Sequence, residues 1–111
     1  MTLDIKRYHD LADSLLDLEI LMREAGVWEC EKPEEEAFKS RVPFAVDCMT
    51  FNQWLKFIMI PKFKEMIELG SPLPRTSSIA EYASEAGLNL SPENERKILH
   101  CIRSIDQILS Q

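Results

Sequence analysis

The chain has 111 residues, of which 45% are hydrophobic and 29% are charged, and its formal net charge at pH 7 is −6. This balance excludes a disordered chain, which lacks the apolar residues needed to offset the entropy lost on folding. Because domains of about 100–150 residues enclose one hydrophobic core, residues 1–111 are expected to form a single domain. The negative charge repels phosphate backbones and anionic membrane surfaces, so direct nucleic-acid binding is disfavoured.

The cysteines and the short apolar runs predict a cytoplasmic location without membrane insertion. Three cysteines, Cys30, Cys48 and Cys101, cannot all pair within one chain, and their wide spacing is unlike that of secreted disulfide-rich domains. The amino-terminal residues lack the basic region and apolar stretch of a secretory signal. The most apolar run, residues 54–60, is far shorter than the ~20 residues that cross a bilayer.

The first predicted element is one long amphipathic helix over residues 3–25, in which apolar side chains recur at three- and four-residue steps. The buried stripe is expected to contain Tyr8, Leu11, Leu15, Leu18, Met22 and Ala25, widened by Ala12, Leu16 and Ile20. Gly26 follows where a left-handed cap would end the helix.

Residues 27–43 are predicted to form a solvated connection, rich in glutamate around Pro33 and basic at Lys39 and Arg41. One helical turn is expected at residues 33–38, because proline is well tolerated at the first position of a helix. The alternative interpretation is an acidic patch that binds a partner.

The central helix is predicted over residues 50–69. Thr50 and Gln53 have the spacing of a capping box, and the apolar residues that follow face nearly every direction around the axis. Pro61 is expected to kink or restart the helix, since it lacks an amide hydrogen and its ring collides with the preceding turn. Gly70 provides the stop.

The last third of the chain predicts a stiff connector and two further helices. Residues 71–74 contain two prolines and are interpreted as a strap across the bundle with Leu73 buried, the alternative being a polyproline recognition segment. Ser78 with Glu81 and then Ser91 mark the starts of a short helix and a final long one. The fold class is therefore all-α, a small bundle of about four helices with the second broken at a proline.

No residue pattern predicts a catalytic, metal or cofactor site. The glycines are isolated, which excludes a glycine-rich phosphate loop, and neither His9 nor His100 has a histidine partner four residues away for zinc. Cys101 is interpreted as a buried apolar side chain rather than a nucleophile. The sequence therefore predicts no catalytic residue, no bound metal and no cofactor.

Asp47 stands among apolar neighbours just before the central helix, and it is either an acceptor for backbone amides or a site carboxylate. The candidates for ligand or partner contact are Trp28, Pro43, Phe44, Asp47 and Trp54. A basic face for RNA would use Lys39, Arg41, Lys56, Lys62, Lys64 and Arg75, although the usual fate of such residues is a solvated surface.

One ordered set of residues is not required by general helix building: Trp28, Pro43-Phe44, Asp47, Met49, Trp54-Leu55, Ile60-Pro61 and Pro72-Leu73-Pro74. This set resembles the YqcC-like family of small bacterial proteins, over nearly the whole chain. The resemblance implies an all-helical bundle without a defined biochemical role, associated with tRNA pseudouridine synthase C. Synthases of that kind use an aspartate in a Gly-Arg-Leu-Asp-type segment on a much larger fold. Val46 precedes Asp47 here, so no catalytic role transfers.

The leading functional hypothesis is a non-catalytic accessory or adaptor protein beside an RNA-modifying enzyme such as a pseudouridine synthase. It predicts an exposed apolar or acidic patch. The first alternative is a small-molecule or enzymatic pocket near Trp28, Asp47 and Trp54. The second is direct tRNA binding through the central lysines and arginines, which would make affinity depend strongly on salt.

Overall fold

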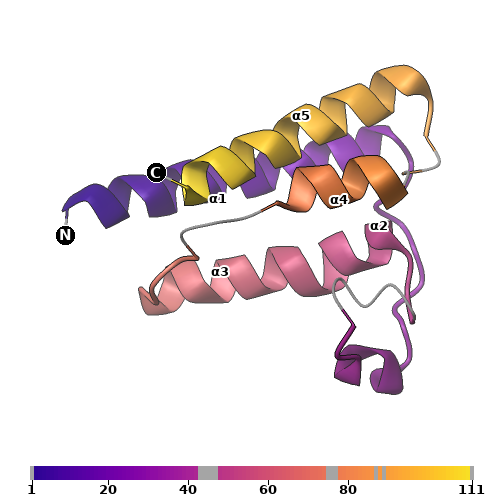
Figure 1. Cartoon of the computed structure of the whole chain (residues 1–111), viewed down its shortest axis with the longest axis horizontal. Helices are drawn as coiled ribbons and strands as arrows, with labels where there is room; N and C mark the ends of the chain where they lie inside the picture. Colours follow the sequence, from indigo (N-terminus) through magenta and orange to yellow (C-terminus); the bar gives the residue numbers. More distant parts are fainter. Residues whose placement is uncertain (1, 43–47, 75–77, 87, 89, 111) are drawn as a thin grey trace.

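A computed structural model describes residues 2–42, 48–74, 78–86, 88 and 90–110 of the chain. Its elements, in chain order, are α1 (Thr2–Glu24), the 3-10 turn η1 (Glu35–Lys39), α2 (Phe51–Trp54), the π-helical turn η3 (Leu55–Met59), α3 (Ile60–Leu69), α4 (Ile79–Ala86) and α5 (Pro92–Leu109) (Figure 1). All of these described elements are helical, which confirms the predicted all-α class. None of the described helices is long and apolar enough to cross a membrane.

The core lies where the first and last helices of the chain pack along each other, with α4 beside α5 (Figure 1). Each of the two long helices presents a continuous apolar face to the other, as its three- and four-residue spacing requires. The most deeply buried side chains of this pair are Leu11, Leu15, Leu18 and Met22 on α1 and Ile98, Ile102, Ile105 and Leu109 on α5. Burying each such side chain contributes about 1.5–3 kcal/mol, so this pairing dominates the stability of the fold.

A buried arginine fastens the start of α1 to the end of α5. The guanidinium of Arg7 donates hydrogen bonds to the carbonyl oxygens of Ile108 (Nε, 3.3 Å) and Leu109 (Nη2, 2.7 Å). The last carbonyls of a helix have no partner within it and carry the negative end of its dipole, so a cation is well suited to this place.

The connector after α3 is held by the same part of α1. Nη2 of Arg7 also donates to the carbonyl of Pro74 at 3.1 Å, and the hydroxyl of Tyr8 donates to the carbonyl of Ser71 at 2.5 Å. Leu73, between these two points, is buried in the core. The interpretation of residues 71–74 as a strap with Leu73 tucked in is confirmed.

A side chain from α5 caps the start of α4. The two carboxylate oxygens of Asp106 accept hydrogen bonds from the backbone amides of Ile79 at 3.1 Å and Ala80 at 2.9 Å. The first amides of any helix lack partners within it, and a carboxylate there also meets the positive end of the dipole. The pattern at Ser78 and Glu81 predicts the position of this start but not the contribution of Asp106.

Replacing Asp106 with alanine is expected to lower the free energy of unfolding by about 1–2 kcal/mol, because two amides at the start of α4 lose their acceptor. Chemical denaturation monitored by circular dichroism measures the change. Alanine at the neighbouring exposed Gln107 serves as the control and should have an effect within about 0.5 kcal/mol. Equal effects of the two substitutions would contradict the capping role.

The central helix starts as predicted but is irregular one turn before the proline. Thr50 and Gln53 form the full capping box. The backbone N–H of Gln53 donates to Oγ1 of Thr50 at 3.1 Å, and the backbone N–H of Thr50 donates to Oε1 of Gln53 at 2.8 Å. The amide of Ile60 donates to the carbonyl of Leu55, five residues earlier, so η3 is a π turn. Regular α-helix restarts at Ile60 with Pro61 in its first turn, which confirms the predicted break at the proline, and the widened turn before it relaxes the collision that a proline ring makes in a regular helix.

Two predicted helix ends are confirmed by their backbone geometry. Gly26 and Gly70 have φ angles of 78° and 65°, in the left-handed region that side chains with a Cβ rarely adopt. The amides that follow them close the ends, since Val27 donates to the carbonyl of Met22 at 3.0 Å and Ser71 donates to that of Met66 at 2.9 Å.

Candidate interaction surfaces

The helix α1 carries a second apolar face that points away from the core. Leu16 and Ile5 are each 57% exposed and Ile20 is 47% exposed, whereas the adjacent Leu15 is 1% exposed. Ala12 lies on the same outward side and is exposed as well. The prediction that Ala12, Leu16 and Ile20 widen the buried stripe is therefore wrong. We call Ile5, Ala12, Leu16 and Ile20 the α1 outward stripe.

This stripe is bordered by two hollows. The hollow between α1 and α3 is lined by Ile5, Tyr8, His9, Ala12 and Ile67. The hollow between α1 and α5 is lined by Ser14, Asp17, Ile20, Leu21, Lys97, His100, Cys101 and Ser104. Ile5 and Ala12 are part of the wall of the first hollow and Ile20 is part of the wall of the second, so one hollow borders each half of the stripe. Both hollows have apolar and polar walls.

The charges of α1 are arranged unevenly around the stripe. Asp13 and Asp17 directly follow Ala12 and Leu16, and a step of one residue turns about 100° around a helix, so both carboxylates lie along one edge. The cations at the two ends of the helix are already engaged in exposed ion pairs, Lys6 with Asp10 at 2.8 Å and Arg23 with Glu19 at 3.0 Å. Lys97 of α5 lines the same hollow as Asp17, but it pairs with Glu93 of its own helix at 3.6 Å, so the edge formed by Asp13 and Asp17 keeps its acidic character.

Trp28, one of the predicted contact residues, lies between two cations. The guanidinium carbon of Arg23 is 5.1 Å and the ammonium nitrogen of Lys56 is 4.8 Å from the centre of its ring. Lys56 also donates a hydrogen bond to the Trp28 carbonyl at 2.6 Å. Cation–π contacts of this kind contribute about 0.5–1 kcal/mol at exposed sites. This cluster joins the segment after α1 to the π turn.

Trp54 is the other predicted contact residue that the structure describes. Trp54 stacks on Phe51 with ring centres 5.5 Å apart, and both tryptophans pack against the core. Pro43, Phe44 and Asp47 lie outside the residues that the structure describes. A ligand pocket near Trp28, Asp47 and Trp54 therefore stays a prediction.

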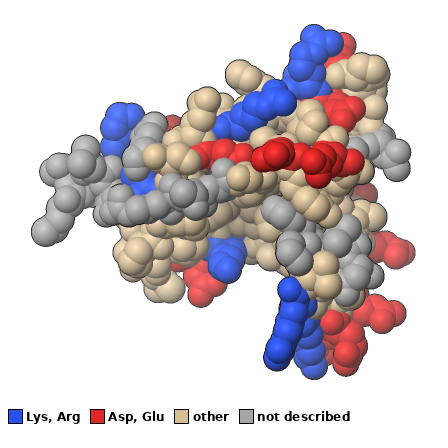
Figure 2. All heavy atoms as spheres, in the orientation of Figure 1, with Lys and Arg blue, Asp and Glu red and all other residues tan. Residues whose placement is uncertain are grey.

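The residues of the predicted RNA face differ in their surroundings. Lys39, Arg41, Lys62 and Lys64 are exposed, while the ammonium group of Lys56 is turned towards Trp28 and Arg75 lies outside the described residues. Figure 2 shows positive and negative side chains close together at the end of the molecule that contains η1. Mixed charges of this kind attract a phosphate backbone less than a cluster of cations would. RNA contact stays a prediction.

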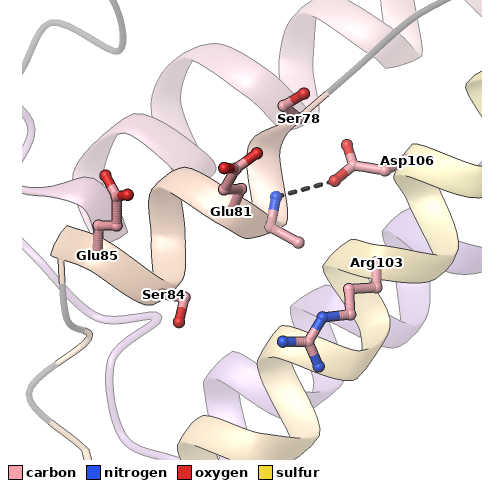
Figure 3. Close-up of a pocket in the computed structure, with 7 residues that line it drawn as sticks. Ser78, Glu81, Ser84, Glu85, Arg103 and Asp106 are labelled. Carbon is pink, nitrogen blue, oxygen red and sulfur yellow. Dashed lines mark hydrogen bonds between the residues drawn. The ribbon is translucent and has the colours of Figure 1, made fainter.

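A third hollow, between α4 and α5, is lined mostly by residues with polar or charged side chains (Figure 3). Asp106 in its wall is occupied by the amides of α4, and the figure shows Glu81 and Glu85 on the side of α4 turned away from Arg103. Among the described residues, no group of three or more histidine, cysteine, aspartate or glutamate side chains is placed to hold a metal ion.

The pKa of the Cys101 thiol is strongly raised. This thiol is buried and donates to the carbonyl of Ser14 at 3.4 Å. Burial, and secondly the negative charge of Asp17, raise the pKa of the Cys101 thiol from 9.0 to about 11. A nucleophilic cysteine requires the opposite displacement, so the chemistry of this thiol fits the predicted structural role.

The raised pKa of Cys101 makes stability depend on pH in a defined direction. The unfolded thiol loses its proton near pH 9 and the native thiol near pH 11, so raising the pH across this range favours unfolding. The stabilisation of the wild type relative to Cys101→Ala should be complete below pH 9 and should shrink above it. Urea midpoints of both proteins at pH 7 and pH 10.5 test this. The exposed Cys48→Ala variant is the control, and a wild-type advantage over Cys101→Ala that is constant with pH would contradict the assignment.

Together these features define a small helical protein with an outward apolar ridge on its first helix and an unreactive buried thiol. The model of the DUF446 family, described as tRNA pseudouridine synthase C, matches residues 10–108. The chain belongs to this family, which agrees with the resemblance found in its sequence.

Three relatives are similar over part of the chain. A Haemophilus influenzae protein named only as uncharacterized is 38% identical over 72 residues, which are 65% of this chain and 68% of that protein. A Pectobacterium carotovorum protein named tRNA pseudouridine synthase C is 35% identical over 72 residues, which are 65% of this chain but 19% of that protein. Escherichia coli YqcC is 34% identical over 65 residues, 59% of this chain and 60% of that protein.

The fold has a solved counterpart. The solution structure of YqcC from E. coli has a TM-score of 0.82 to this structure at 26% sequence identity, covering 95% of this chain and 89% of that one. The whole helical arrangement is therefore shared with that protein.

Proposed function

We propose that this chain is a non-catalytic accessory protein that acts beside a tRNA pseudouridine synthase. The observation that carries the proposal is the Pectobacterium relative, in which the matched stretch is 19% of a protein named tRNA pseudouridine synthase C. Most of that protein lies outside the match, so the helical domain accompanies a larger body there. A separate chain of the same family is expected to meet its enzyme through surface contact.

Features of the molecule support binding over catalysis. The α1 outward stripe provides the exposed apolar patch that an adaptor requires. The thiol of Cys101 has its pKa raised, and the carboxylate of Asp106 is occupied by helix amides. Neither group is prepared for nucleophilic or acid–base work.

The direct test mixes the purified chain with the purified tRNA pseudouridine synthase C of the same organism. Sedimentation velocity should detect a complex, and it should persist after ribonuclease treatment because the contact is between proteins. Pseudouridine formation is then measured for the synthase with and without the chain, and for the chain alone, which should form none. The absence of both a complex and any change in synthase activity, with or without tRNA, would exclude the proposal.

A further inference from the structure

We propose that the α1 outward stripe is a docking surface for an amphipathic helix whose apolar face is bordered by lysine or arginine. The inference rests on the proposed accessory role, because it names the surface and the kind of partner segment through which that role would be exercised.

The exposure of the stripe is unusual for its position. Ile5, Leu16 and Ile20 are large apolar side chains, each about half exposed or more, on one side of a single helix. From residue 5 to residue 20 the stripe extends about 22 Å, at 1.5 Å per residue. Apolar anchors at seven- and four-residue steps are the pattern by which helices bind one another side by side. Singly scattered apolar residues need no explanation, but an aligned set does.

The shape of the surroundings also suits a helix. A ridge of side chains packs into the groove of a partner helix, and the partner's own ridges need grooves in return. The hollow beside Ala12, towards α3, and the hollow beside Ile20, towards α5, provide such grooves next to the first and second halves of the stripe.

Charge determines which helix fits. Asp13 and Asp17 line one edge of the stripe, and the whole chain has a net charge of −6. Lysine or arginine on the partner would therefore be attracted to this edge, whereas glutamate would be repelled. A second copy of this chain fits poorly, because an antiparallel pair of α1 helices would bring the same acidic edge of both copies together.

The test uses two synthetic 18-residue amphipathic helices as probes, with the same leucine face and with either lysine or glutamate along one edge. Binding to the full chain is measured by fluorescence anisotropy. The lysine peptide should bind at least about tenfold more tightly than the glutamate peptide, and added salt should reduce this preference. Failure of the lysine peptide to bind, or equal affinities for the two peptides, would overturn the proposal.

Variants of the chain locate the binding. The double variant Leu16→Gln with Ile20→Gln should weaken binding of the lysine peptide at least about tenfold. Asp13→Asn with Asp17→Asn should bring the affinities of the two peptides closer together. Leu69→Gln is the matched control, because Leu69 is 71% exposed on another helix and should leave the affinity unchanged. Since all these side chains are exposed, circular dichroism should show intact folding, and unchanged binding by the Leu16 and Ile20 double variant would place the site elsewhere.

The docking surface and the proposed function can fail separately. If the synthase binds the double variant as well as it binds the wild type, the accessory role stands and the surface is wrong. If the peptide results hold but the synthase does not bind, the surface stands and its partner is another protein.

Discussion

Replacing Leu15 with alanine is expected to lower the free energy of unfolding by about 3–5 kcal/mol, whereas the same change at Leu16 should have an effect within about 0.5 kcal/mol. The two leucines are neighbours on one helix, with equal side chains and equal helix propensity. Leu15 is 1% exposed in the contact with α5, and Leu16 is 57% exposed. Alanine at Leu15 leaves a cavity in a packed core, and alanine at Leu16 removes only a solvated side chain.

Urea unfolding monitored by circular dichroism compares the two variants with the wild type under the same conditions. A domain of this size is stable by about 5–15 kcal/mol, so Leu15→Ala should still fold but with a much lower midpoint. The m-values should agree, because both variants expose nearly the same surface on unfolding. If Leu15→Ala and Leu16→Ala lowered the free energy of unfolding by comparable amounts, the outward face of α1 would be covered. That result would contradict the proposed docking surface.

The second large effect is expected at Arg7. Replacing it with methionine should lower the free energy of unfolding by about 3–4 kcal/mol, because the carbonyls of Pro74, Ile108 and Leu109 lose a charged donor. Methionine keeps most of the aliphatic volume, so the measurement reports mainly on the hydrogen bonds and the charge. Arg7→Lys should recover only part of the loss, since an ammonium group lacks the planar fork of a guanidinium.

The neighbouring Lys6 provides the control for Arg7. Its side chain is 72% exposed and pairs with Asp10 across one helical turn, an arrangement that contributes about 0.3–0.5 kcal/mol. Lys6→Met should therefore change the thermal midpoint by only a few degrees, whereas Arg7→Met should lower it by more than about 10 °C. Similar shifts for both substitutions would show that Arg7 does not fasten the two long helices.

Local signals in the sequence were enough to predict where helices begin and end. Thr50 with Gln53, and Gly26 and Gly70, act through the backbone within one helical turn, so their neighbours in sequence decide the outcome. The hydrogen bond from Arg7 to the Leu109 carbonyl joins residues 102 positions apart, and no local pattern predicts it. The cap that Asp106 provides for Ile79 and Ala80 also joins residues far apart in the sequence, so no local pattern predicts it.

The candidate site was harder to predict than the fold. Helical spacing alone places Leu16 and Ile20 in the core, but that spacing is shared by both faces of α1. Plotting the angular positions would have separated them from Leu15 and Leu18, but only the packing of α5 decides which set is buried. The role of Trp28 in ligand or partner contact stays a prediction, and its neighbours Arg23 and Lys56 come from different segments, which no local pattern brings together.

The π turn η3 allows the central helix to contain one additional residue without changing which of its side chains are buried. In an uninterrupted α-helix, Ile60 and Phe63 would lie roughly a third of a turn away from the side occupied by Phe51 and Leu55. All four are buried, because the additional residue in the π turn absorbs this offset. The turn thus behaves as a one-residue insertion that keeps both halves in phase. Deleting one residue within Leu55–Met59 would restore a regular helix with the same buried side. The deletion would also shift Lys56 from the position in which its ammonium group donates to the Trp28 carbonyl.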